Sequence, residues 1–80
     1  MTAYDVAVDF MDMTDDRHLW TRTDDVRPGV TLAVGAYVTV GDEDADPAVA
    51  RVVRIDPEGI IELAVLPGGV DEHRDLLTLG

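Results

Sequence analysis

The sequence predicts an all-β protein: a small antiparallel barrel of five or six strands, with at most one short helical turn near the C-terminus. Three observations support this class. Residues 51–66 have the pattern of a β-hairpin, residues 3–11 and 36–40 alternate apolar and polar side chains, and breaks containing Gly or Pro separate these stretches. We expect residues 1–80 to form a single small β-barrel domain, because closing the sheet protects strand edges in so small a chain.

The hairpin is the clearest element, because its turn residues determine which side chains face each other. Asp56 and Pro57 suit the first positions of a type I turn, and Gly59 suits the left-handed position that closes a three-residue hairpin loop. The register that follows pairs Ile55 with Ile61 and Val53 with Leu63 on one face, and Arg54 with Glu62 and Val52 with Ala64 on the other. One face is then apolar and the other carries an ion pair, as expected for a half-buried hairpin.

The remaining elements are shorter. Alternation over residues 3–11 predicts a strand that buries Tyr4, Val6, Val8 and Phe10. Residues 17–23 form a mixed segment that we interpret as a second strand folded back on the first. Residues 36–40 predict a strand with Val38 and Val40 on one face. Residues 70–75 suit a single helical turn, and residues 76–79 a last short strand.

This outline is similar to that of a known superfamily. A first strand ends at Phe10, a long excursion covers residues 11–34, and Gly-Ala-Tyr-Val-Thr-Val follows at 35–40. With a three-strand meander and a short turn before the closing strand, the order resembles the SH3-like small β-barrels of the KOW and Tudor types. The resemblance implies a fold that commonly binds peptides, nucleic acids or other domains, and that usually lacks catalysis. The sequence has no basic face for RNA, no evident aromatic cage and no proline-recognition motif.

The charge balance restricts the partners. The chain has 17 acidic residues against six arginines, no lysine, and a formal net charge of −11. A high-GC genome or a salty cytoplasm would produce this acidic, lysine-free composition without any role of the charge in function. As a functional property, the charge argues against direct nucleic-acid binding and favours a basic protein partner. We expect neither a signal peptide nor a membrane span, and therefore a cytoplasmic protein.

Catalysis and metal binding have little support. The chain contains no cysteine and no serine, and a barrel filled by side chains offers no cleft for paired carboxylates, so we expect no enzyme and no cofactor. Asp42, Asp44 and Asp46 alternate as at the start of a calcium-binding loop. The rest of that motif fails, because Pro47 and Val53 stand where glycine and glutamate are required. The loop over residues 42–46 is therefore a weak candidate for divalent ions.

Four residues are candidates for partner binding: Trp20, Arg22, Tyr37 and Arg51. Trp20 either plugs one end of the barrel or anchors an interface, in which case Tyr4 or Tyr37 would be its aromatic neighbour. The hairpin register places Arg51 on the apolar face, so it must either reach water at the barrel mouth or bind a carboxylate of a partner. A bulge near Ala50 would also turn it outward.

We therefore expect a non-catalytic interaction or accessory module that binds another protein through a barrel edge and the 11–34 excursion. The alternative is an acidic mimic of nucleic acid that occupies the basic site of a DNA- or RNA-binding protein, suggested by aspartates at 12–16, 24–25 and 42–46. Divalent-ion binding at 42–46 is a weaker alternative. The sequence leaves the partner, the pathway and the oligomeric state open.

Overall fold

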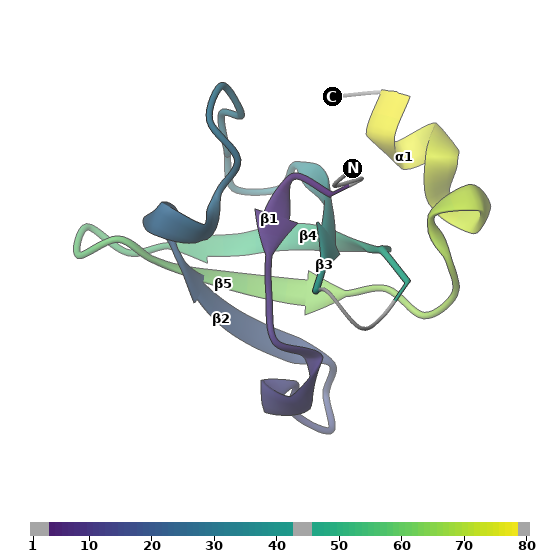
Figure 1. The fold of residues 1–80 in the computed structure, drawn as a ribbon, viewed down its shortest axis with the longest axis horizontal. Coiled ribbons are helices and arrows are strands. Elements are labelled where there is room, and N and C mark those ends of the chain that lie inside the picture. Colours follow the sequence, from purple (N-terminus) through teal and green to yellow (C-terminus); the bar gives the residue numbers. More distant parts are fainter. Residues whose placement is uncertain (1–3, 43–45, 79–80) are drawn as a thin grey trace.

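The computed structural model describes residues 4–42 and 46–78, and most of its regular structure is strand. Five strands in this part of the chain form one sheet in the order β1-β3-β4-β5-β2 (Figure 1). The strands are β1 (Val6–Ala7), β2 (His18–Arg22), β3 (Tyr37–Gly41), β4 (Ala48–Ile55) and β5 (Ile60–Val65). Three 3-10 helices, η1 (Phe10–Asp12), η2 (Thr23–Asp25) and η3 (Val70–His73), and one α-helix, α1 (Arg74–Thr78), complete the described structure. The all-β prediction is confirmed.

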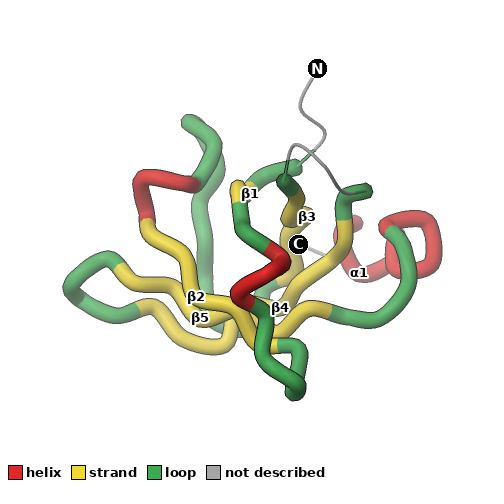
Figure 2. The backbone as a smooth tube through the Cα atoms, turned by 60° about the horizontal axis from the view of Figure 1, so that its bottom comes forward, coloured by secondary structure: helices red, strands yellow, loops and turns green. Residues whose placement is uncertain are grey.

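The sheet curls into a half-barrel, with β1 lying across its open side (Figure 2). Pairing is antiparallel from β3 through β4 and β5 to β2, whereas β1 pairs with β3 in parallel. After β2 the chain returns to β1, where Val26 forms an antiparallel bridge with Val6. The Thr21 hydroxyl, which is buried, also donates a hydrogen bond to the Ala7 carbonyl oxygen at 3.1 Å. These contacts join the two ends of the sheet.

The core lies inside this curl and consists mainly of aliphatic side chains from every strand. Its buried members are Val6, Leu19, Val38, Val40, Ala50, Val52, Ile61, Leu63 and Val65. Alternation along β2, β3 and β5 places every second residue inside, so the intervening residues face outward. The predicted inward positions of Val38 and Val40 are confirmed.

The hairpin turn forms as predicted. The Gly59 amide donates to the Asp56 carbonyl oxygen at 2.9 Å, and Gly59 has a φ of 93°, in the left-handed region. Ile55 pairs with Ile61 and Arg54 with Glu62, in the predicted register. Ile61 is fully buried, whereas Ile55 is 37% exposed at the end of β4.

Beyond these pairs the predicted register is wrong, because β4 contains a bulge. The register shifts between Val52 and Arg54, so Val53 is an extra residue, and Val52 pairs with Leu63 instead of Ala64. Arg51 consequently pairs with Ala64 and faces outward. An uninterrupted ladder would bury the Arg51 guanidinium and expose Val52, at a cost of several kcal/mol for an unpaired charge. The bulge avoids this by burying Val52.

The N-terminal segment departs from the predicted strand over residues 3–11. Among the described residues 4–11, only Val6–Ala7 is strand, because the chain turns into η1, where the Asp9 carboxylate accepts a hydrogen bond from the Met11 amide at 3.0 Å; Ala3 lies outside the described residues. The predicted pairing of the second strand with the first is also wrong, since β2 pairs with β5.

The helical turn predicted over residues 70–75 is confirmed, but the helix continues to Thr78, where a strand over residues 76–79 was expected; Leu79 lies outside the described residues. Acidic residues in the first turns of η3 and α1 suit the positive N-terminal end of a helix. Val49 shows what this segment covers: it is fully buried yet lies outside the core cluster, on the opposite side of β4 from Ala50. Because η3 contacts β4 and α1 contacts β3, the helical segment shields this part of the outer face.

Candidate interaction surface

The outward side chains of four strands form two rows across the sheet. In the first row, cross-strand partners run from Tyr37 through Arg51 and Ala64 to His18. In the second, Arg54 lies beside Glu62, and Glu62 beside Trp20. We call this surface the Trp20 face; its residues are His18, Trp20, Arg22, Tyr37, Arg51, Arg54, Ile60, Glu62 and Ala64. All four residues predicted to bind a partner therefore lie on one face of the sheet.

These four residues form two separate pairs on that face. Tyr37 and Arg51 are direct cross-strand neighbours on β3 and β4. Trp20 and Arg22 lie on β2, on the far side of β5. Arg51 is exposed and forms no ion pair with any described residue. Its outward position comes from the bulge at Val53, and not from a bulge near Ala50.

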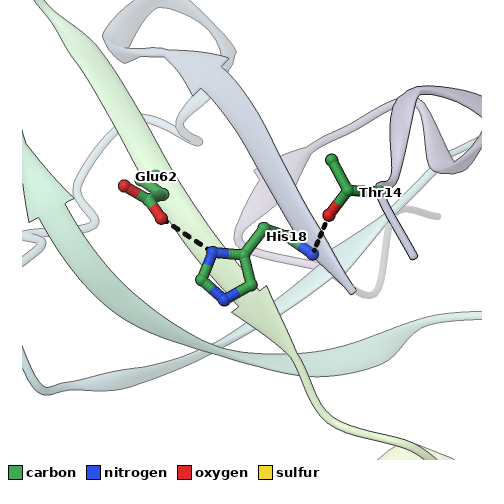
Figure 3. Close-up of polar contacts among 3 residues, drawn as sticks. All are labelled: Thr14, His18 and Glu62. Atoms are coloured by element: carbon green, nitrogen blue, oxygen red, sulfur yellow. Dashed lines mark hydrogen bonds and ion pairs between the residues drawn. The ribbon is translucent and has the colours of Figure 1, made fainter. Parts of the chain in front are cut away.

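Trp20 is 52% exposed and does not plug the barrel, because its neighbour Leu19 takes the inward position on β2. Its aromatic neighbour is His18, with the ring centroids 6.3 Å apart and the planes inclined at 48°. His18 is held in turn by Glu62, whose Oε2 lies 2.7 Å from His18 Nδ1 (Figure 3). The expectation that Tyr4 or Tyr37 would be the neighbour is wrong: Tyr37 pairs with Arg51, and the Tyr4 ring lies over Gly41.

A hollow lies on each side of Trp20. The first, which we call the hairpin hollow, has a volume of about 230 Å³ and is lined by Trp20, Arg54, Asp56, Ile60 and Glu62. The second, the seam hollow, measures about 280 Å³ and lies where β2 faces residues 7–12. Its lining residues are Ala7, Val8, Asp9, Asp12, Trp20, Thr21 and Asp25. Trp20 thus forms a ridge between two hollows that both have carboxylates in their lining.

The edge of β2 beside the seam is largely occupied. The His18 amide donates to the Thr14 hydroxyl at 3.1 Å (Figure 3). The Thr14 amide donates to the His18 carbonyl oxygen at 3.0 Å. The Arg22 amide donates to the Asp25 carboxylate at 3.4 Å. These bonds leave no continuous row of backbone groups for an added strand. A partner at β2 would therefore have to contact side chains, and the exposed side chain at the centre of β2 is Trp20.

The other predicted sites do not come together. Asp42 and Asp46 flank residues 43–45, and Asp44 lies outside the described residues. Within residues 4–42 and 46–78, no three His, Cys, Asp or Glu side chains are placed to hold a metal ion. The two histidines are used separately, His18 with Glu62 and His73 with the Pro67 carbonyl oxygen at 2.6 Å. Among the helices described, none has the length and apolar character needed to cross a membrane.

Sequence reasoning missed the carboxylates that surround Trp20. Glu62 could have been found from the hairpin register combined with β2–β5 pairing, but that pairing has no local signal. A third hollow was also missed; it measures about 440 Å³ and lies between the 26–32 segment and the hairpin, with Val26, Pro28, Val30, Leu32 and Ile55 in its lining.

The Trp20 face combines an exposed aromatic ring, the hydrogen-bonded neighbours His18 and Glu62, and two open hollows, a composition suited to binding a polar partner. In comparison with known proteins, the chain matches no family model, and neither the curated proteins nor the solved structures give a significant match.

Proposed function

We propose that this protein is a non-catalytic interaction module that binds another protein through the Trp20 face and the adjoining part of the 11–34 excursion. The observation that carries the proposal is the exposure of Trp20, the only tryptophan in the chain, on a ridge between two hollows. Tryptophan is enriched among residues that dominate binding energy, because a partner can bury its large ring while its N–H finds an acceptor. The proposal includes a cytoplasmic location.

Side-chain recognition agrees with the state of the β2 edge. Because Thr14 and Asp25 bind the backbone groups on either side of Trp20, a partner gains little from strand addition there. The binding site we propose is thus the outer face of β2 and β5 together with the seam beside it. The expected binding site was a barrel edge; we propose that the partner contacts the side chains at the β2 edge and not its backbone.

Affinity capture with two alanine variants tests the proposal. Trp20→Ala should lose a partner that the wild-type protein retains from its source lysate, because truncating a central aromatic anchor removes about 2 kcal/mol or more of binding free energy. Val34→Ala is the matched control, since Val34 is a 64% exposed apolar residue that lies outside the Trp20 face. Circular dichroism checks that both variants fold. Retention of the same partner by Trp20→Ala would contradict the proposal.

A mimic of nucleic acid is a second candidate. It is favoured by five aspartates, Asp5, Asp9, Asp12, Asp24 and Asp25, which line two adjoining hollows on either side of the β1 segment. Such a mimic would displace DNA or RNA from a basic protein, and its affinity would fall steeply with added salt. A competition assay, in which this protein and DNA compete for the captured partner, measures the displacement directly. A partner that binds no nucleic acid would contradict the mimic hypothesis.

We also propose kinship with the SH3-like barrels. The curled five-stranded sheet and the strand at Tyr37–Gly41 support it, whereas the parallel pairing of β1 with β3 has no counterpart in the expected antiparallel barrel. An experimental structure compared strand by strand with KOW and Tudor barrels is the test.

A further inference from the structure

We propose that the partner segment bound at the Trp20 face is basic, with lysine or arginine side chains entering the hollows on both sides of Trp20. This inference rests on the proposed function and names the chemistry of its partner. It depends on the exposed Trp20 ring, on the two hollows that flank it, and on the charges that line them.

The seam hollow has negative charge without a counter-charge. Asp9, Asp12 and Asp25 line it, and no arginine in residues 4–42 or 46–78 forms an ion pair with any of them. Within the described part of the chain, Asp9 and Asp25 accept hydrogen bonds from backbone amides and from the Thr21 hydroxyl, and neither is paired with a cationic side chain. Three exposed carboxylates around one hollow create a local negative potential, and a cationic side chain of a partner would neutralise it.

The hairpin hollow offers a different environment for a cation. Glu62 and Asp56 line it together with Arg54, and the Arg54 guanidinium is already engaged with Asp56 at 3.4 Å. Glu62, whose Oε2 is already bonded to His18 Nδ1 at 2.7 Å, lies beside Trp20 on the neighbouring strand. A cation entering here would meet this carboxylate and the aromatic ring together. Aromatic rings attract cations through their negative faces, and tryptophan does so most strongly. Arginine suits this hollow especially, because its planar group can stack on the ring.

An acidic partner is the main competing occupant. Arg22 and Arg51 lie on the same face and have no ion pair among the described residues. However, neither lines a hollow beside Trp20, so a carboxylate bound to them would not also be held at the ridge. The net charge of −11 would in addition slow the approach of an acidic chain and accelerate that of a basic one. The carboxylates that line the two hollows therefore favour a basic segment over an acidic one.

Peptide binding to the intact protein tests the inference. The probes are a short fluorescein-labelled peptide containing arginine and lysine and its counterpart with glutamate at the same positions, measured by anisotropy at one fixed ionic strength. The basic peptide should bind and shift the emission of Trp20, the only tryptophan, whereas the glutamate peptide should not. Trp20→Ala should weaken binding by at least about tenfold.

A pair of charge variants separates a specific site from general attraction. Asp12→Asn removes a carboxylate that lines the seam hollow, and should weaken binding of the basic peptide by about threefold. Asp71→Asn changes the net charge by the same amount on η3, which lines neither hollow, and should leave the affinity unchanged. Equal weakening by both variants would mean attraction by net charge only and would overturn the inference.

The outcomes for the proposed function are distinct from these. Loss of the cellular partner by Trp20→Ala supports the proposed function. If that partner binds Asp12→Asn as well as it binds the wild-type protein, or contacts the Trp20 face with acidic residues, the inference of a basic partner segment is wrong while the proposed function stands. If Trp20→Ala retains both the cellular partner and the basic peptide, the Trp20 face itself is refuted.

Discussion

Val52→Ala should strongly destabilise the protein, whereas the same substitution at its neighbour Val53 should have a small effect. Val52 is fully buried in the core, where it pairs with Leu63. Removing its two methyl carbons costs about 1.6 kcal/mol of transfer free energy, at about 0.8 kcal/mol per buried carbon. The cavity left behind raises the expected loss of unfolding free energy to about 2–3 kcal/mol. Val53, half-buried at the bulge, should lose less than about 1 kcal/mol.

This comparison discriminates between two registers of the hairpin. In an uninterrupted ladder, Val53 would pair with Leu63 inside the barrel and Val52 would face outward, so the two effects would be reversed. Because both variants make the same chemical change at adjacent positions of β4, differences in strand propensity cancel.

Urea denaturation followed by far-UV circular dichroism measures the two losses. A domain of this size should give a slope of about 1–3 kcal/mol/M, so the Val52→Ala midpoint falls clearly below that of Val53→Ala. Thermal unfolding should show a decrease in Tm of about 8–24 °C for Val52→Ala, at about 4–8 °C per kcal/mol. A loss for Val53→Ala equal to or larger than that for Val52→Ala would refute the bulge and the outward position of Arg51.

Three further variants test the closure of the sheet, the turn and the protected edge. Thr21→Val removes a buried hydroxyl that joins β2 to the β1 segment, and should lower the unfolding free energy measured in urea by about 1–2 kcal/mol. Thr21→Ser is the control, because it keeps the hydroxyl and should retain the hydrogen bonds. Gly59→Ala should lower the unfolding free energy, measured by thermal unfolding, by about 1–2 kcal/mol, because the φ of Gly59 is 93°. Gly69→Ala is the control: nothing lies within 4 Å of the added carbon, and the unfolding free energy should change by less than about 0.5 kcal/mol. Thr14→Ala should accelerate exchange of the His18 amide hydrogen by about fivefold, since it removes the acceptor of that amide; unchanged exchange would mean that the edge is protected in another way.

Much of the interaction surface could be anticipated residue by residue, but its arrangement could not. The exposed candidates were named one by one, and the turn correctly sets Glu62 opposite Arg54. What brings Trp20 beside Glu62 is the pairing of β2 with β5, between segments about forty residues apart. No local pattern specifies that partner, because any strand with a buried apolar face satisfies the same alternation. The seam hollow likewise depends on how residues 7–12 cross the open edge of β2.

The sequence by itself determined the class of the fold, the hairpin turn and the inward faces of β3 and β5. These follow from local chemistry: Gly59 accepts a positive φ, and apolar residues at every second position bury one face. Only the tertiary structure decided the bulge at Val53, the parallel pairing of β1 with β3, and the continuation of the C-terminal helix to Thr78 in place of a last strand. Each of these depends on burial against residues distant in the sequence. Arg51 is exposed and Val52 is buried on β4 because the bulge shifts the register of the hairpin. This shift stabilises the protein only when β4 is paired with β5, because that pairing determines which face of β4 is buried.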